Sequence, residues 1–189
     1  MSIKNGLITD LFLKRVEMEK KKNWGKEFEK AIKKSVPDYA LLYRLPDSAQ
    51  SFGGCNNLRF SRKNPFDFLL WDSKRHILYA IEAKTVSGKS ISFERSKDEN
   101  GEIHYHQVIG LNEWNEYDGI TCGLIIEFRE IEKTIFLRIE DYNDLVKVID
   151  KKSFNYNDLI ESKINFFIIQ QQRKRTKYQY DIDDFLTKV

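Results

Sequence analysis

The feature that most constrains the fold is a pair of apolar segments joined by a short polar turn. The first, residues 66–71, is apolar apart from Asp67, and the second, residues 77–84, stays apolar until Glu82 and Lys84 near its end. Side chains alternate faces along a strand, so Glu82 and Lys84 share one face, about 6.6 Å apart along the chain. The turn between the segments predicts an antiparallel hairpin that brings Asp67 near Glu82.

Two carboxylates and an ammonium group at one end of a hairpin admit two interpretations. Asp67 and Glu82, with Glu29 as a further candidate, can bind Mg²⁺ through hard oxygen ligands, and the Ala83 carbonyl can supply a backbone ligand. Lys84 would then orient or deprotonate an attacking water and offset charge on the phosphate. Alternatively, Glu82 and Lys84 form a salt bridge at the rim of the sheet. The spacing alone leaves both open.

Length and composition indicate one domain of 189 residues with a sizeable core, since 41% of the residues are hydrophobic and 13% aromatic. The formal charge of +3 does not by itself indicate a nucleic-acid partner. Cys55 and Cys122 are far apart and without metal-site spacing, which predicts free thiols in a reducing compartment. No apolar run reaches the ~20 residues of a membrane span. We expect a cytoplasmic protein with no membrane partner.

The remaining periodicity predicts helices and strands around the hairpin. Glu29 lies at the edge of an apolar helical stripe, where it either points toward the site or pairs with Lys26 or Lys33. Gln107 lies on the sheet-facing side of another helix, where it satisfies a strand end or reaches the charged cleft. We predict helices at residues 7–22, 24–34, 103–117, 141–149, 157–162 and 182–187, and strands or apolar runs at 39–45, 119–127, 134–139 and 164–169.

Two further expectations concern the region around Gln107. Residues 85–102 are polar and contain glycine, which predicts a loop. His104 and His106 are two positions apart and cannot both face one point on a helix, so we expect rim residues and no histidine metal site.

Cations gather in two segments that suit DNA contact. Residues 46–64 form a long polar connection whose aromatic residues accompany basic ones, and such a loop inside a compact domain is often functional. The C-terminal segment, residues 151–189, carries a basic run interleaved with tyrosines. An ordinary solvated loop and a solvated charged segment are the competing interpretations. The candidate DNA-binding residues are Arg44, Arg59, Arg62, Lys63, Lys89, Arg173, Lys174 and Arg175.

Five motifs in order carry a resemblance to a known family. They are G-K-E-F-E at residues 25–29, L-R-F-S-R-K-N-P-F-D-F at 58–68, I-E-A-K-T at 81–85, S-I-S-F at 90–93 and H-Q at 106–107. This succession resembles the RecU-type Holliday junction resolvases, especially their phage-borne relatives within the PD-(D/E)XK nuclease superfamily.

The resemblance implies an α/β fold with a restriction-endonuclease-like core, that is, a central mixed β-sheet flanked by helices with a protruding basic loop. It implies a Mg²⁺- or Mn²⁺-dependent homodimer that cuts four-way DNA junctions by paired nicking, with a recombinase as a further candidate partner. By motif match Asp67, Glu82 and Lys84 take the catalytic positions, while Glu29 matches the supporting acidic residue of the first helix and Gln107 the helix glutamine. All five are candidate catalytic residues, and the candidate metal ligands remain Asp67, Glu82 and Ala83. Residues 1–22 then form a helical extension, and residues 46–64 occupy the place of the family's stalk.

The chain departs from the family at one motif, since it has N-P-F-D-F where bacterial members carry T-T-D-Y around the first aspartate. Two other functions therefore stay open. One is another PD-(D/E)XK nuclease, of restriction type or nonspecific. The other is a non-catalytic DNA-binding accessory protein of recombination.

Overall fold

The computed structural model describes residues 23–46, 63–175 and 177–189. The helix predicted at residues 7–22 lies outside the described residues, as does most of the predicted loop at 46–64. Arg59, Arg62 and Cys55 belong to the part left out, so the predictions for them stay predictions. Cys122 is buried with a free thiol, as expected for it.

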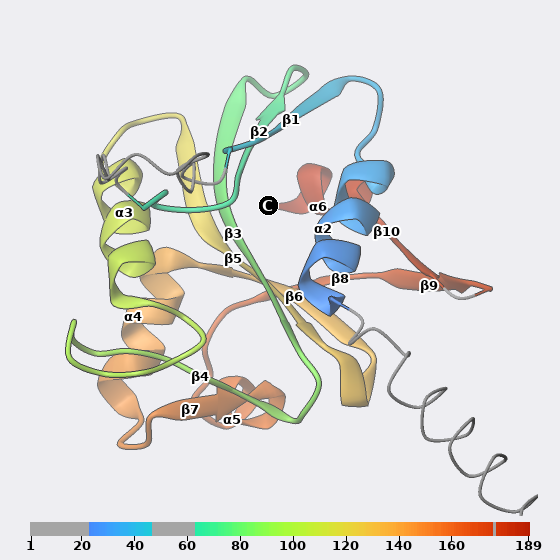
Figure 1. Ribbon diagram of the computed structural model, residues 1–189. Helices are drawn as coiled ribbons and strands as arrows, with labels where there is room; N and C mark the ends of the chain where they lie inside the picture. The colour runs from blue at the N-terminus through green and yellow to red at the C-terminus, as the bar shows by residue number, and fades with distance from the viewer. Residues whose placement is uncertain (1–22, 47–62, 176) are drawn as a thin grey trace, which may run out of the picture.

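A six-stranded mixed sheet in the order β1-β2-β3-β5-β6-β8 forms the centre of the fold (Figure 1). β3 and β5 are parallel, and all other neighbours in the sheet are antiparallel. The predicted α/β class with a central mixed sheet and flanking helices is therefore confirmed. The strands are β1 (Ala40–Arg44), β2 (Phe68–Asp72), β3 (Ile77–Val86), β5 (Ile120–Phe128), β6 (Lys133–Arg138) and β8 (Phe167–Ile169).

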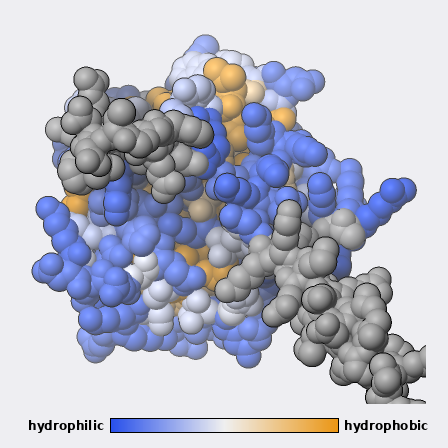
Figure 2. Space-filling view, viewed as in Figure 1, coloured by the Kyte–Doolittle hydropathy of each residue, from blue (hydrophilic) through white to orange (hydrophobic). Residues whose placement is uncertain are grey.

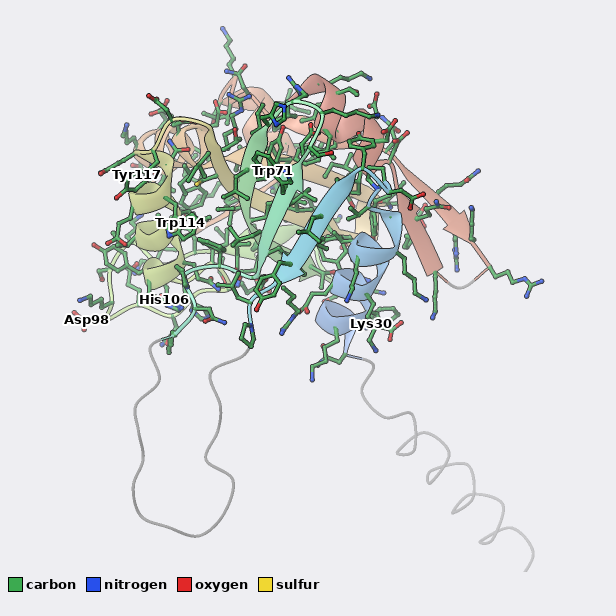
Figure 3. The ribbon with its side chains drawn as sticks, turned by 90° about the horizontal axis from the view of Figure 1, so that it is seen from above. Lys30, Trp71, Asp98, His106, Trp114 and Tyr117 are labelled. Carbon is green, nitrogen blue, oxygen red and sulfur yellow. The ribbon has the colours of Figure 1, made fainter. Side chains whose placement is uncertain are left out.

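Helices cover both faces of this sheet, and the view from above separates them (Figure 3). The crossover between parallel β3 and β5 contains α3, because parallel neighbours need a long connection. One face packs against α3 (Tyr105–Asn115), α4 (Ile139–Val148) and α5 (Tyr156–Glu161). The other packs against α2 (Trp24–Ser35) and α6 (Ile182–Lys188).

The alternation predicted along β3 divides its side chains between these two layers. Ala80 and Val86 belong to the core on the α3 face. Tyr79 and Ile81 belong to the core on the α2 face. Glu82 and Lys84 lie between Ala80 and Val86 on the α3 face, where they interrupt the apolar pattern.

One prediction about a loop needs correction. Residues 85–102 are not only a loop, because β3 continues to Val86 and β4 (Ser90–Ser92) pairs with β7 (Ser153–Asn155). A buried Ile91 anchors β4, and three residues give too short a pattern to recognise in the sequence. The C-terminal segment supplies β8 and α6 to the core, at the apolar run predicted at 164–169 and the helix predicted at 182–187. It also forms a two-stranded hairpin of β9 (Gln171–Lys174) and β10 (Lys177–Tyr180).

The surface in the view of Figure 2 is mostly hydrophilic, with hydrophobic side chains showing over β1 and β2. Leu41 and Tyr43 on the edge strand β1 are well exposed. No helix among the described residues is both long and apolar enough to cross a membrane.

Candidate active site

Asp67 lies where β2 and β3 part. β2 begins at Phe68, opposite Ile81, whereas β3 continues to Val86 beside β5. The Asp67 N–H donates to the Ile81 carbonyl (3.1 Å), and its carboxylate Oδ2 accepts from the Ala83 N–H (3.0 Å). The carboxylate thus takes up the hydrogen-bonding position along β3 that a continuation of β2 would otherwise fill.

The backbone of Ala83 contributes a second polar group to this open edge. The N–H and C=O of one strand residue point to the same side, which is why paired residues of antiparallel strands exchange both bonds. Since the Ala83 N–H meets Asp67, the Ala83 carbonyl also faces the edge that β2 has left.

Glu82 is held by two donors on one of its oxygens. Its Oε1 accepts from Lys84 Nζ at 2.9 Å and from Gln107 Nε2 at 2.5 Å. The side chain is 3% exposed, and its Oε2 has no hydrogen-bond partner among the described residues. The sequence left two partners open for Gln107, a strand end or the charged cleft. The structure shows that Gln107 reaches the charged cleft, where it donates to Glu82. The remaining oxygen of Glu82 is an unmatched, buried acceptor of the kind that costs about 1–3 kcal/mol.

Burial dominates the electrostatics of both acids. It raises the pKa of Glu82 to about 7, and the charge of Asp67 adds to the rise while the Lys84 ammonium opposes it. Burial likewise raises the pKa of Asp67, against the bond from the Ala83 N–H, and the charge of Glu29 raises it further. Three carboxylates therefore act on one another, and a cation among them would favour their charged forms.

Glu29 comes to this group from α2, on the other layer of the fold. Its carboxylate accepts from Arg44 Nε at 2.7 Å, so the predicted alternative of pairing with Lys26 or Lys33 is wrong. A partner on the neighbouring strand β1 replaces a partner one helical turn away. Arg44 was predicted to contact DNA, and here it holds Glu29 beside Asp67.

The donor set fits a hard divalent cation such as Mg²⁺. Asp67 and Glu82 offer carboxylate oxygens, Ala83 offers a carbonyl, and Oε2 of Glu82 has no competing partner among the described residues. No group of three or more His, Cys, Asp or Glu side chains with metal-site geometry occurs in the described part of the chain. Two carboxylates are sufficient for Mg²⁺, which keeps several water ligands.

Among the described residues, most of the other cations predicted to contact DNA lie away from this site. Lys89 is paired with Glu130 at 3.5 Å on an exposed surface. Arg173, Lys174 and Arg175 belong to the β9–β10 hairpin and its turn, beside α2. Lys63 lies closer to the site than these residues do. Its charge lowers the pKa of His106, the residue that precedes Gln107.

The histidines beside Gln107 are arranged differently from the prediction. α3 begins at Tyr105, and His104 has an extended backbone as its N-cap. The His104 ring therefore stacks on that of His106, with centroids 5.5 Å apart, and its Nδ1 lies 2.7 Å from Glu94. Both histidines are rim residues, as expected. The prediction that their side chains cannot face one point is wrong, because His104 precedes the helix and does not follow its geometry. The sequence offered no signal for this cap.

No protein-family model and no curated protein matches the chain. One similar solved structure is that of Archaeoglobus fulgidus Hjc, a Holliday junction resolvase from an archaeal hyperthermophile. The two share 12% sequence identity with a TM-score of 0.43, over 71% of this chain and 90% of that chain. A likeness this distant carries no functional conclusion, so the function has to be inferred from the chain's own residues.

Proposed function

We propose that the chain is a metal-dependent DNA endonuclease that cuts four-way junctions. One observation carries the proposal: Asp67, Glu82 and Lys84 meet at the open end of β2 and β3, with a buried Glu82 oxygen that lacks a partner among the described residues. A structural salt bridge alone has no need of a second acid bonded to the Ala83 N–H. The order of the five sequence motifs adds the resemblance to junction resolvases.

Each residue has a role in this proposal. Asp67, Glu82 and the Ala83 carbonyl hold the divalent cation, which when bound supplies a Lewis acid and lowers the pKa of a water ligand. Lys84 orients the attacking water and stabilises the negative charge that develops on the phosphate. Water adds to phosphorus, the P–O bond to one deoxyribose breaks, and the products are a free hydroxyl and a terminal phosphate.

Two residues position these groups without touching the phosphate. Gln107 donates to the same oxygen of Glu82 as Lys84 and so fixes the rotation of that carboxylate. Glu29 holds Arg44 and adds negative charge beside Asp67. Gln107 thereby keeps Glu82 in one orientation for the cation, and the charge of Glu29 adds to the attraction for the cation.

Two symmetrical cuts require two active sites, and a homodimer with twofold symmetry supplies them. We therefore extend the proposal to a homodimer acting on branched DNA. Light scattering after size-exclusion chromatography tests this part, and a monomeric mass at micromolar concentration, with and without junction DNA, would contradict it.

Cleavage of a synthetic four-way junction, a linear duplex and a single strand of equal sequence tests the function. The proposal expects Mg²⁺-dependent cleavage of the junction and much slower cleavage of the other two. Equal cleavage of duplex and junction would favour a general or restriction-type nuclease. Junction binding without cleavage in any metal would favour the accessory-protein alternative.

A further inference from the structure

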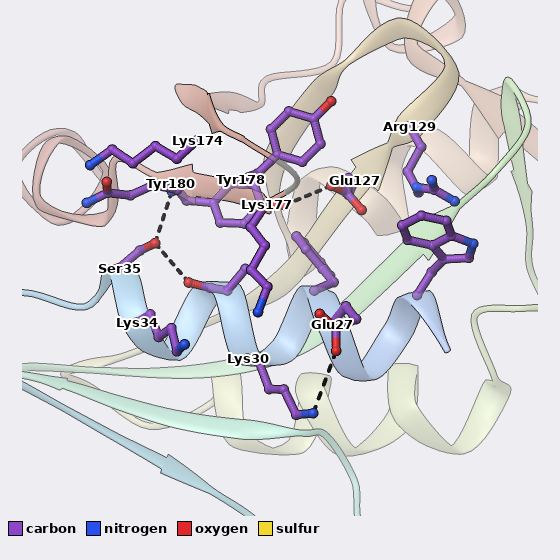
Figure 4. Close-up of a pocket in the computed structure, with 14 residues that line it drawn as sticks. Glu27, Lys30, Lys34, Ser35, Glu127, Arg129, Lys174, Lys177, Tyr178 and Tyr180 are labelled. Carbon is purple, nitrogen blue, oxygen red and sulfur yellow. Dashed lines mark hydrogen bonds and ion pairs between the residues drawn. The ribbon is translucent and has the colours of Figure 1, made fainter. Parts of the chain in front are cut away.

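A cavity of about 390 Å³ lies between α2, the β9–β10 hairpin and the C-terminal end of β5 (Figure 4). Its volume is within the range of about 300–1,000 Å³ that is typical of small-molecule sites. Glu27, Ala31 and Lys34 line it from α2, whereas Glu29 on that helix pairs with Arg44. The cavity is thus separate from the site built on Asp67 and lies across α2 from it.

Aromatic side chains form the walls of this cavity. Trp24 and Phe28 come from α2, and Tyr178 and Tyr180 come from β10. Phe28 and Tyr180 meet edge to face, with centroids 5.4 Å apart. Trp24 is 40% exposed, and the Arg129 guanidinium lies over one face of its ring. Such walls suit a flat aromatic ligand.

The deep end of the cavity carries a carboxylate held in place by two hydroxyl groups. Glu127 is buried, and it accepts from Tyr180 at 2.7 Å and from Thr85 at 2.6 Å. Burial and the charge of Glu127 raise the pKa of Tyr180, so its hydroxyl remains a donor. Each of the two Glu127 oxygens has a second acceptor site, so this carboxylate can accept further bonds from an amino group of a ligand.

Cations surround the mouth (Figure 4). Lys174 and Lys177 are directly opposite each other in the hairpin, an arrangement that is destabilising for like charges. Neither they nor Lys34 has an ion-pair partner in the part of the chain that the structure describes. The Arg129 guanidinium lies over the Trp24 ring at 3.3 Å from its centroid. An anionic group at the mouth would relieve the repulsion between the two hairpin lysines.

We propose that this cavity binds one unstacked nucleotide of a DNA strand. The base enters among Trp24, Phe28 and Tyr178, its amino group faces Glu127, and its phosphate lies against the hairpin lysines. Only a ligand that joins a flat ring bearing an amino group to a phosphate uses all three features. The proposal rests on the proposed function for the identity of the strand, since an endonuclease must hold DNA beyond the bond that it cuts.

Binding of a labelled oligodeoxycytidylate of about 12 nucleotides, followed by fluorescence anisotropy, tests the cavity. The full chain is used in EDTA, so that no cleavage interferes. Trp24→Ala is expected to weaken binding about tenfold, and Trp24→Phe much less, because a phenyl ring still stacks. Lys177→Gln is expected to weaken binding and reduce its salt dependence, because one phosphate contact is lost. Lys147→Gln, which removes an equal charge on α4, is the matched control and should leave binding unchanged.

Equal affinity in the parent, Trp24→Ala and Lys177→Gln would overturn the proposal. Free dCMP carries the same chemistry and is the competing source. Weak displacement of the oligomer by dCMP keeps the strand as ligand. If Trp24→Ala weakens the binding of dCMP but not that of the oligomer, the cavity is a site for a free nucleotide, and the proposal of a DNA strand is wrong.

Junction cleavage in Mg²⁺ separates this proposal from the proposed function. Oligomer binding that depends on Trp24, in a protein that never cleaves, overturns the nuclease and keeps the cavity. If the protein cleaves junctions but Trp24→Ala and Lys177→Gln bind the oligomer as the parent does, the nucleotide site in the cavity is wrong and the nuclease function stands.

Discussion

Replacing Glu82 with glutamine is expected to stabilise the metal-free protein at pH 8 while removing one of its proposed metal ligands. Burial raises the pKa of Glu82 from 4.5 to about 7 in the folded protein. Between these values the folded state binds the proton more tightly than the unfolded state does. The free energy of unfolding therefore falls as the pH rises from 4.5 to about 7, and this penalty is complete at pH 8.

The size of the effect follows from that pKa difference. A rise from 4.5 to about 7 corresponds to about 3 kcal/mol of destabilisation at pH 8. Glutamine removes the buried charge but leaves an amide group without a partner at the position of Oε2, at a cost of about 1–3 kcal/mol. We expect a net gain of about 1 kcal/mol at pH 8. At pH 5 the parent is already largely neutral at Glu82, so the gain should vanish or reverse.

Urea unfolding in EDTA at pH 5 and pH 8 measures the difference in free energy of unfolding between the parent and Glu82→Gln, provided that the two proteins have equal m-values. Glu161→Gln changes an exposed glutamate on α5 and serves as the control, with no expected dependence on pH. If the Glu82→Gln variant is no more stable than the parent at pH 8, or is stabilised equally at both pH values, then the buried charge of Glu82 does not destabilise the folded protein.

Two further substitutions test the packing around each site. Gly110→Ala would place a methyl group against Pro65, two residues before Asp67, so we expect a loss of about 1–3 kcal/mol in urea unfolding and slower cleavage. Tyr180→Phe removes one of two bonds to the buried Glu127, so we expect a loss of about 1–3 kcal/mol by the same measurement.

Each of these has a matched control. An alanine Cβ at position 88 meets nothing within 4 Å, so Gly88→Ala should leave both stability and cleavage almost unchanged. Tyr178→Phe removes an exposed hydroxyl bond to Glu132, so its effect should be smaller than that of Tyr180→Phe. If Gly88→Ala and Tyr178→Phe lower the free energy of unfolding as much as Gly110→Ala and Tyr180→Phe do, then the close approach at Gly110 and the burial of Glu127 are not the cause of the losses.

The main chain of the site could be predicted because its pattern is local. β3 is long enough to show alternation, and Glu82 and Lys84 are the two positions that interrupt the apolar pattern on one of its faces. The turn before His76 is short, so the pairing of β2 with β3 follows from it. The apolar stripe of α3 likewise predicts that Gln107 faces the sheet.

Contacts between distant segments could not be predicted. Nothing in the sequence near Glu29 indicates that Arg44 holds it, because that pair depends on how α2 crosses β1. The cavity beside α2 could not be predicted for the same reason, since Trp24 and Tyr178 line one cavity only when the C-terminal hairpin folds back. The short strands β4 and β7 carry too few residues to show a period.

A nuclease site at Asp67, Glu82 and Lys84 is tested by the rate of junction cleavage as Mg²⁺ is varied, under single-turnover conditions with the parent, Asp67→Asn and Lys84→Ala. We expect a parent rate that saturates with Mg²⁺ and vanishes in EDTA. We also expect a loss of about 10²–10³-fold in each folded variant, because each removes a group that stabilises the transition state. A parent that never cleaves, or variants that cleave at the parent's rate, would contradict the assignment of Asp67, Glu82 and Lys84 as a nuclease site.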